Sequence, residues 1–160
     1  MSGGVASRGP GIRFPAPVIF AGVFLAGWGL HRIWHLPIEA GGGGTILLVS
    51  GWLLIVSGLG LGAAGISTLV KARTTFLPDR ESNSLVVAGP FAISRNPIYV
   101  GMMAIYVGAA LVANMAWPIL LLPLVWILMR VLIINREERY LAGKFGATYS
   151  EYHRRVRRWL

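Results

Sequence analysis

Long apolar stretches alternate with short polar connections along this chain. The apolar stretches cover roughly residues 17–36, 45–70, 97–113 and 117–135. A helix needs about 20 predominantly apolar residues to cross a bilayer, so the first and fourth stretches have the right length and the second can tilt. The third stretch is at the short limit. The pattern predicts an all-α, polytopic membrane protein with about four transmembrane helices.

The chain becomes polar after Asn135, and we expect the fourth helix to continue beyond the membrane until Phe145-Gly146 breaks it. Beyond that point one helical face carries apolar and aromatic residues at positions i, i+4, i+7 and i+11: Phe145, Tyr149, Tyr152 and Val156. The segment 136–160 is therefore predicted to contain a C-terminal amphipathic helix. Two compatible roles stay open for it, which are anchoring on anionic lipid and covering a site formed by residues 71–96.

The remaining sequence is organised as one unit. Residues 1–16 are rich in Gly, Ser and Pro and are predicted to form a flexible tail. Residues 17–160 then form a single membrane domain, because roughly 100–200 residues is the usual size of one domain. The first apolar stretch is not a convincing signal peptide, since it lacks a clear small-residue cleavage site and carries His31, Arg32 and His35 at its far end.

Composition supports the membrane assignment. The chain of 160 residues is 55% hydrophobic and only 13% charged, whereas soluble domains carry about 25% charged residues. These values exclude a disordered chain and argue against an ordinary soluble domain. The absence of cysteine excludes a disulfide framework, a thiolate metal site and a cysteine nucleophile, and we expect no metal.

The net charge of +9 is concentrated at three places. Thirteen of the fifteen Lys and Arg residues fall within residues 8–13, 71–95 and 136–158. Four spans place all three clusters on one membrane face, which the positive-inside rule makes cytoplasmic. We therefore expect an integral protein of a bacterial inner membrane or an equivalent membrane, with both termini and the polar loop 71–96 cytoplasmic. The expected partners are membrane lipids and not nucleic acid.

The second apolar stretch contains a glycine pattern that resembles a nucleotide-binding motif. Gly60-x-Gly62-x-x-Gly65 matches the dinucleotide fingerprint formally, but no strand precedes it and no acidic residue follows at about 20 residues. The same segment contains Gly58-x-x-x-Gly62, which is typical of close helix packing in lipid. We interpret the glycines as a packing face.

Polar groups outside the spans gather in residues 76–99 and 136–153, which share one membrane face in the predicted topology. Gly89-Pro90 predicts a turn, and Pro97 is suited to the first turn of the third helix. The N-terminus of that helix offers unpaired backbone N–H groups. The pattern indicates a ligand cradle at the membrane surface without naming the ligand.

Two of these segments resemble a known family. The runs SLVVAGPFAISRNPIYVG at 84–101 and EERYLAGKFGATYSEYHRRV at 137–156 are similar to the isoprenylcysteine carboxyl methyltransferase and phospholipid methyltransferase superfamily. The resemblance covers about Thr74 to Trp159 and rests on the paired motifs. It implies an integral membrane methyltransferase that uses S-adenosylmethionine and acts on a lipophilic substrate from the bilayer.

The resemblance also implies a set of site residues. Arg95 and Glu137 are the catalytic candidates. Arg130 lies outside both motifs and is the substrate-binding candidate by its chemistry alone, because arginine pairs well with a carboxylate; the alternative is that it extends to the lipid headgroups. The cofactor-binding candidates are Asn83, Ser84, Leu85, Val86, Phe91, Asn96, Pro97, Ile98, Tyr99, Glu137 and Glu138. Family members often carry histidine where Asn96 stands, so a titrating role at that position is in doubt. Glu137 and Glu138 are adjacent and point about 100° apart on a helix, so they cannot face the same partner.

The choice of acceptor depends on whether the site offers a base. A carboxylate is ionised at neutral pH and needs no general base, whereas an amine or thiol must first lose a proton. No histidine is expected at the site, which favours a carboxylate such as that of an isoprenylated cysteine; a phospholipid amine is the second choice. Two other classes remain possible: an NADPH-dependent membrane reductase, because some sterol-type reductases resemble this family at their C-termini, and a non-enzymatic membrane protein.

Overall fold

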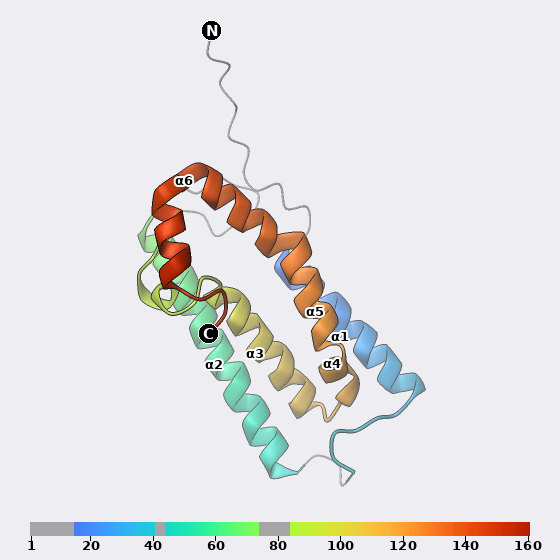
Figure 1. Cartoon of the computed structure of the whole chain (residues 1–160). Coiled ribbons are helices and arrows are strands. Elements are labelled where there is room, and N and C mark those ends of the chain that lie inside the picture. The colour runs from blue at the N-terminus through green and yellow to red at the C-terminus, as the bar shows by residue number, and fades with distance from the viewer. Residues whose placement is uncertain (1–14, 41–43, 74–83) are drawn as a thin grey trace.

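The computed structural model describes residues 15–40, 44–73 and 84–160, and every regular element within these ranges is helical (Figure 1). The helices are α1 (Ala16–Ile33), α2 (Thr45–Lys71), the short 3₁₀ helix η1 (Gly89–Ala92), α3 (Pro97–Val112), α4 (Ala116–Leu120), α5 (Leu122–Leu128), the π-helix η2 (Met129–Ile134) and α6 (Asn135–Arg155). The predicted all-α class is confirmed for this part of the chain.

Two helices are long and apolar enough to cross a membrane. These are α1 with 18 residues and α2 with 27, whereas the apolar α3 has 16. Large apolar side chains such as Ile46 and Leu53 cover the outside of α2, at 81% and 63% exposure. Lipid is the environment that suits such a surface. The structure therefore supports a membrane protein, and four complete spans remain a prediction.

The first helix ends three residues earlier than the predicted span. Trp34 follows Ile33 in an extended conformation, with φ −121° and ψ 94°. Pro37 lies three residues further on and cannot donate a helical backbone hydrogen bond. The segment after α1 is instead held by Asn114, whose Oδ1 accepts hydrogen bonds from the backbone N–H groups of Ile38 and Glu39, each at 3.0 Å.

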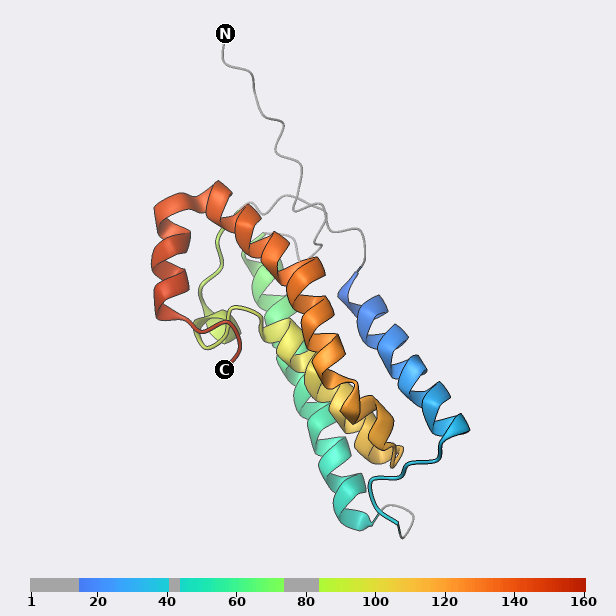
Figure 2. The ribbon, with the colours of Figure 1, turned by 45° about the vertical axis from the view of Figure 1, so that its right-hand side comes forward.

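The helices run back and forth, so that one end of the bundle gathers the start of α3, the end of α2 and α6 (Figure 2). The tightest contact joins α2 to α3. A Cβ placed on Gly58 would lie 2.5 Å from the Gly101 carbonyl oxygen, and one on Gly108 would lie 2.5 Å from the Gly51 oxygen. No side chain fits in either place, so glycine lets the two backbones touch.

The packing role of these glycines is confirmed, but their predicted spacing is wrong in part. The contact face of α2 repeats every seven residues, through Gly51, Gly58 and Gly65. An added Cβ on Gly62 would meet no atom within 4 Å. The close contact therefore follows a heptad face, because a seven-residue step returns nearly to the same side of a helix.

A second core lies between α1 and the helices that follow α3. The rings of Phe20 and Phe24 approach the Tyr106 ring edge-on, at centroid distances of 6.1 and 5.4 Å. The Tyr106 hydroxyl donates a hydrogen bond of 2.9 Å to the Pro118 carbonyl oxygen. The buried Tyr106 hydroxyl is thereby hydrogen-bonded, as buried tyrosine hydroxyls usually are.

The fourth predicted stretch is a chain of short helical pieces. The chain turns at Leu121, between α4 and α5, and continues through the π-helix into α6 without leaving helical geometry. The expected continuation beyond Asn135 is confirmed. So is the break at Phe145-Gly146, because Gly146 has φ +52° and ψ −121°, a conformation that glycine adopts readily.

Beyond this break α6 folds back toward the start of α3 (Figure 1). Tyr149 and Tyr152 of the predicted apolar face are each only 4% exposed. The Tyr152 hydroxyl donates a hydrogen bond of 2.7 Å to the Phe91 carbonyl oxygen. The second half of α6 therefore covers the segment before α3, and its contact with lipid remains a prediction.

Candidate functional site

Three segments meet at the α6 end of the bundle. They are residues 84–99, the first half of α6, and the second half of α6 with the residues after it. All the predicted site residues except Arg130 and Asn83 belong to these segments. Asn83 lies outside the described residues.

The residues after α6 bind the loop that precedes α3. The Arg95 backbone N–H donates a hydrogen bond of 2.9 Å to the Arg157 carbonyl oxygen. The Arg158 carbonyl oxygen accepts hydrogen bonds from Asn96 Nδ2 at 2.9 Å and from Ser94 Oγ at 3.3 Å. Asn96 is therefore a buried positioning residue, because its amide holds the loop to the C-terminal segment.

Glu138 is the centre of an ion-pair network. Its carboxylate lies 3.3 Å from Arg95 Nη1 and accepts a hydrogen bond of 3.0 Å from Arg158 Nε. The Arg95 side chain is only 8% exposed. Its Nη1 atom has the ion pair with Glu138, whereas its Nε atom is buried and has no hydrogen-bond partner in the part of the chain that the structure describes. A buried donor without a partner costs free energy, so this Nε atom is suited to binding an acceptor group of a ligand.

Glu137 faces a different partner. The Tyr99 hydroxyl donates a hydrogen bond of 2.6 Å to Glu137 Oε1. Burial raises the pKa of Glu137 to about 7; the Tyr99 hydrogen bond acts in the opposite direction, and the neighbouring Glu138 charge raises it further. The prediction that the two glutamates face different partners is confirmed, and Glu137 can change charge near neutral pH.

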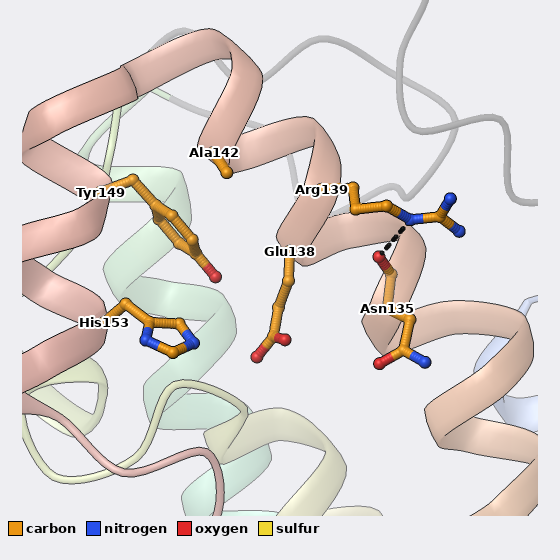
Figure 3. A pocket seen from close by; sticks show the side chains of 6 residues that line it. All are labelled: Asn135, Glu138, Arg139, Ala142, Tyr149 and His153. Carbon is orange, nitrogen blue, oxygen red and sulfur yellow. Dashed lines mark hydrogen bonds between the residues drawn. The ribbon is translucent and has the colours of Figure 1, made fainter.

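A pocket of about 430 Å³ lies between the two halves of α6 (Figure 3). Its lining is Asn135, Glu138, Arg139, Ala142, Tyr149 and His153. The side chains of Glu138, Tyr149 and His153 point into the same space from opposite sides. Burial raises the pKa of the Tyr149 hydroxyl above its usual value, as does the Glu138 charge, so this group remains a neutral donor at physiological pH.

The expectation that no histidine faces the site is wrong. His153 lines the pocket, with its ring centroid 6.0 Å from that of Tyr149. The fold-back at Gly146 turns the second half of α6 toward the first half and brings His153 opposite Glu138 (Figure 3). Sequence spacing signalled the break but not its direction, and this is why His153 was missed.

The other predicted site residues have structural contacts. Ser84 Oγ donates a hydrogen bond of 3.2 Å to the Ala72 carbonyl oxygen, and Leu85 and Val86 are half-buried beside it in sequence. Pro97 and Ile98 pack against α2, where a Cβ on Gly65 would lie 2.7 Å from Ile98 Cγ1.

Arg130 lies apart from this cluster. It belongs to η2 and is exposed, and its guanidinium lies 5.2 Å from the centroid of the Trp126 ring. This geometry is that of a cation–π contact. A role in substrate binding remains a prediction.

Comparison with known proteins assigns the family. Residues 46–148 match the phospholipid methyltransferase family. The chain is also 32% identical over 108 residues to the cobalt-zinc-cadmium resistance protein CzcN of Cupriavidus metallidurans, a match that covers 68% of this chain and 49% of that protein. The chain thus spans about half the length of this relative. No solved structure gives a significant match. The family match extends over more than half of the chain and includes nearly all of α2, all of α3 and the Glu137–Glu138 pair, and the protein therefore belongs to the phospholipid methyltransferase family.

Proposed function

We propose that this protein transfers a methyl group from S-adenosylmethionine to a lipophilic acceptor at the membrane surface. The observation that carries the proposal is the pocket between the halves of α6, together with the buried, incompletely bonded guanidinium of Arg95 next to it. A volume of about 430 Å³ is within the range of small-molecule sites, which runs from about 300 to 1,000 Å³.

The donor set suits this cofactor. The Nε–H group of Arg95 has no hydrogen-bond partner among the described residues and can donate to a carboxylate oxygen, a group that arginine binds well. Glu138 can accept hydrogen bonds from an ammonium or hydroxyl group, and the Tyr149 ring offers an aromatic face to an adenine or a sulfonium. Arg95, Glu138 and Tyr149 are therefore the residues that would hold the molecule.

The chemistry requires little from the protein beyond positioning. S-adenosylmethionine supplies an already activated methyl group on a sulfonium. The remaining work is to orient the acceptor in line with the donor and to exclude water. The ion pairs of Glu138 with Arg95 and Arg158 fix the loop before α3 against α6, and this holds the pocket walls in one geometry.

His153 changes the choice of acceptor. The sequence favoured a carboxylate because no base was expected at the site, and that premise is wrong. An amine acceptor must release a proton as it is methylated, and the His153 imidazole, which lines the pocket, is a side chain of the kind that accepts protons in catalysis. The described residues therefore favour a lipid amine, with the carboxylate of an isoprenylated cysteine as the second candidate.

Calorimetry on the detergent-purified protein tests the cofactor. We expect S-adenosylmethionine to bind and NADPH not to bind. Glu138→Gln should weaken binding by at least tenfold, since a hydrogen bond to a charged group contributes about 1.5–3 kcal/mol. Glu151→Gln is the matched control, because Glu151 is an exposed acid on the same helix that lies 3.7 Å from Arg155 and does not line the pocket. Binding of NADPH alone would establish the reductase alternative, and no binding of either would refute the proposal.

Transfer of a labelled methyl group separates the acceptors. The protein is supplied in parallel with vesicles containing an aminophospholipid and with an N-acylated S-prenylcysteine. For an amine, His153→Gln should lower the rate strongly and change its pH profile, whereas transfer to a carboxylate should be insensitive to this change. Transfer to the amine that His153→Gln leaves unaltered at every pH would remove His153 as the base.

A further inference from the structure

Two histidines meet at the opposite end of the bundle from the pocket. His31 lies in the last turn of α1, and His35 lies just beyond the end of that helix. Their ring centroids are 4.5 Å apart, and the ring planes are inclined by 56°. Rings at this distance and inclination are not stacked face to face, so their edge nitrogens can point toward a shared position.

One of these rings has a nitrogen that nothing satisfies. His31 Nδ1 is buried and has no hydrogen-bond partner. The polar groups nearby in sequence are used elsewhere: the Trp34 carbonyl oxygen accepts from Trp117 Nε1 at 2.8 Å, and the Glu39 carboxylate accepts from the Gly44 backbone N–H at 2.7 Å. A buried polar atom that remains unpaired in this way calls for a partner, and the residues at 15–40, 44–73 and 84–160 provide none.

The ring separation matches two imidazoles on one metal ion. A metal–nitrogen bond of about 2.0–2.1 Å places each ring centre about 3.2 Å from the metal. When the two metal–nitrogen bonds make an angle of 90° at the ion, the ring centres are about 4.5 Å apart. When they make the tetrahedral angle, the ring centres are about 5.2 Å apart. The observed 4.5 Å corresponds to adjacent positions of a square-planar or octahedral ion. We propose that His31 and His35 form a binding site for a divalent late transition metal, with Cu²⁺ and Ni²⁺ preferred to Zn²⁺.

The same preference follows from ligand number. No group of three or more His, Asp or Glu side chains suited to a metal occurs in the described ranges. A structural zinc site uses four protein ligands, which this pair does not supply. Cu²⁺ heads the affinity order for nitrogen ligands, and with Ni²⁺ it is found in the square-planar and tetragonal geometry that the ring distance indicates. Water completes the coordination, so the affinity is that of a two-point chelate.

The surrounding charge does not oppose the ion. The nearest basic residue in sequence, Arg32, has its guanidinium 5.9 Å from the centroid of the Trp28 ring, one turn back along α1 and away from His35. Because His31 belongs to α1 and His35 to the connection that leads to α2, a shared ion ties the end of the helix to the loop. The site is separate from methyl transfer, which involves the other end of the bundle.

Titration of the tag-free, detergent-purified protein with CuCl₂, NiCl₂ and ZnCl₂ tests the site. Calorimetry should give about one equivalent of Cu²⁺, with Ni²⁺ and Zn²⁺ weaker in that order. His31→Ala and His35→Ala should each weaken Cu²⁺ binding at least tenfold, because each leaves a single imidazole. His153→Ala is the matched control, since it removes the third histidine of the chain at the other end of the bundle, and it should keep the full affinity.

A spectroscopic measurement on the unaltered protein does not depend on how the variants fold. Electron paramagnetic resonance of the Cu²⁺ complex should show coupling to two nitrogens in the unaltered protein and to one in each single variant. Unchanged affinity in both single variants, or a loss confined to His153→Ala, would overturn the proposal.

Discussion

The buried carboxyl of Glu137 makes the stability of the protein depend on pH in an unusual direction. Its folded-state pKa is about 7 against an ordinary value of 4.5, so between these values the folded protein holds a proton that the unfolded chain has released. Stability from this group is complete below the unfolded pKa and is lost as pH rises through the folded pKa. The difference of 2.5 units corresponds to about 3 kcal/mol. Glu137→Gln, which cannot ionise, should therefore be more stable than the unaltered protein at pH 8.5 and equally stable at pH 4.5.

Thermal unfolding followed by tryptophan fluorescence at a series of pH values measures this difference. The melting temperature of Glu137→Gln should exceed that of the unaltered protein by several degrees at pH 8.5, and the two should converge at low pH. Tyr99→Phe should increase the loss of stability with rising pH, because the Tyr99 hydrogen bond favours the ionised form of Glu137. Glu151→Gln, at an exposed carboxyl, should follow the unaltered protein throughout. Parallel curves for Glu137→Gln and the unaltered protein would refute the reasoning.

Three further changes test separate parts of the fold and the site. Gly101→Ala should destabilise the protein by about 1–3 kcal/mol or more, because the added Cβ would lie 2.6 Å from the Gly58 carbonyl oxygen; Gly60→Ala, which meets no atom within 4 Å, is the control, and melting temperatures give the comparison. Tyr152→Phe removes the donor to the Phe91 carbonyl and should cost about 1–2 kcal/mol, with faster proteolysis after Gly146 than in the unaltered protein. Arg130→Gln should leave S-adenosylmethionine affinity unchanged, and a rise in KM for the lipid acceptor without a change in cofactor affinity would assign Arg130 to the acceptor.

Most of the fold was predictable because it depends on local sequence signals. Apolar stretches of the right length gave the helices, and Phe145-Gly146 marked the break in α6. The end of α1 was misplaced because the apolar run continues to Leu36, whereas the helical geometry ends at Ile33. Hydrophobicity reports where a segment lies, but hydrogen bonding determines where a helix ends.

The site was predictable in its members but not in their partners. Adjacent positions on a helix were enough to separate Glu137 from Glu138. The identity of each partner depends on chain segments 20 to 40 residues away, as in the Tyr99–Glu137 and Glu138–Arg158 contacts. His153 and the His31–His35 pair were missed for the same reason, because the direction of the chain after a break or a helix end is a tertiary property.

The π-helix before α6 determines which of the two glutamates Tyr99 binds. Six residues, Met129–Ile134, turn with about 4.4 residues per turn in place of 3.6, and this delays the rotation of everything after them by about 110°, close to one residue position. In a regular α-helix of the same length Glu137 would point where Glu138 now points, toward the arginines, and Tyr99 would lose its acceptor. Deleting one residue from this stretch would allow a regular helix with the present facing of Glu137. Deleting one residue just after it would instead place Glu138 where Glu137 now points and Arg139 where Glu138 now points. The contacts of Glu137 and Glu138 should therefore tolerate the loss of one residue within the π-helix but not the loss of one residue between the π-helix and Glu137.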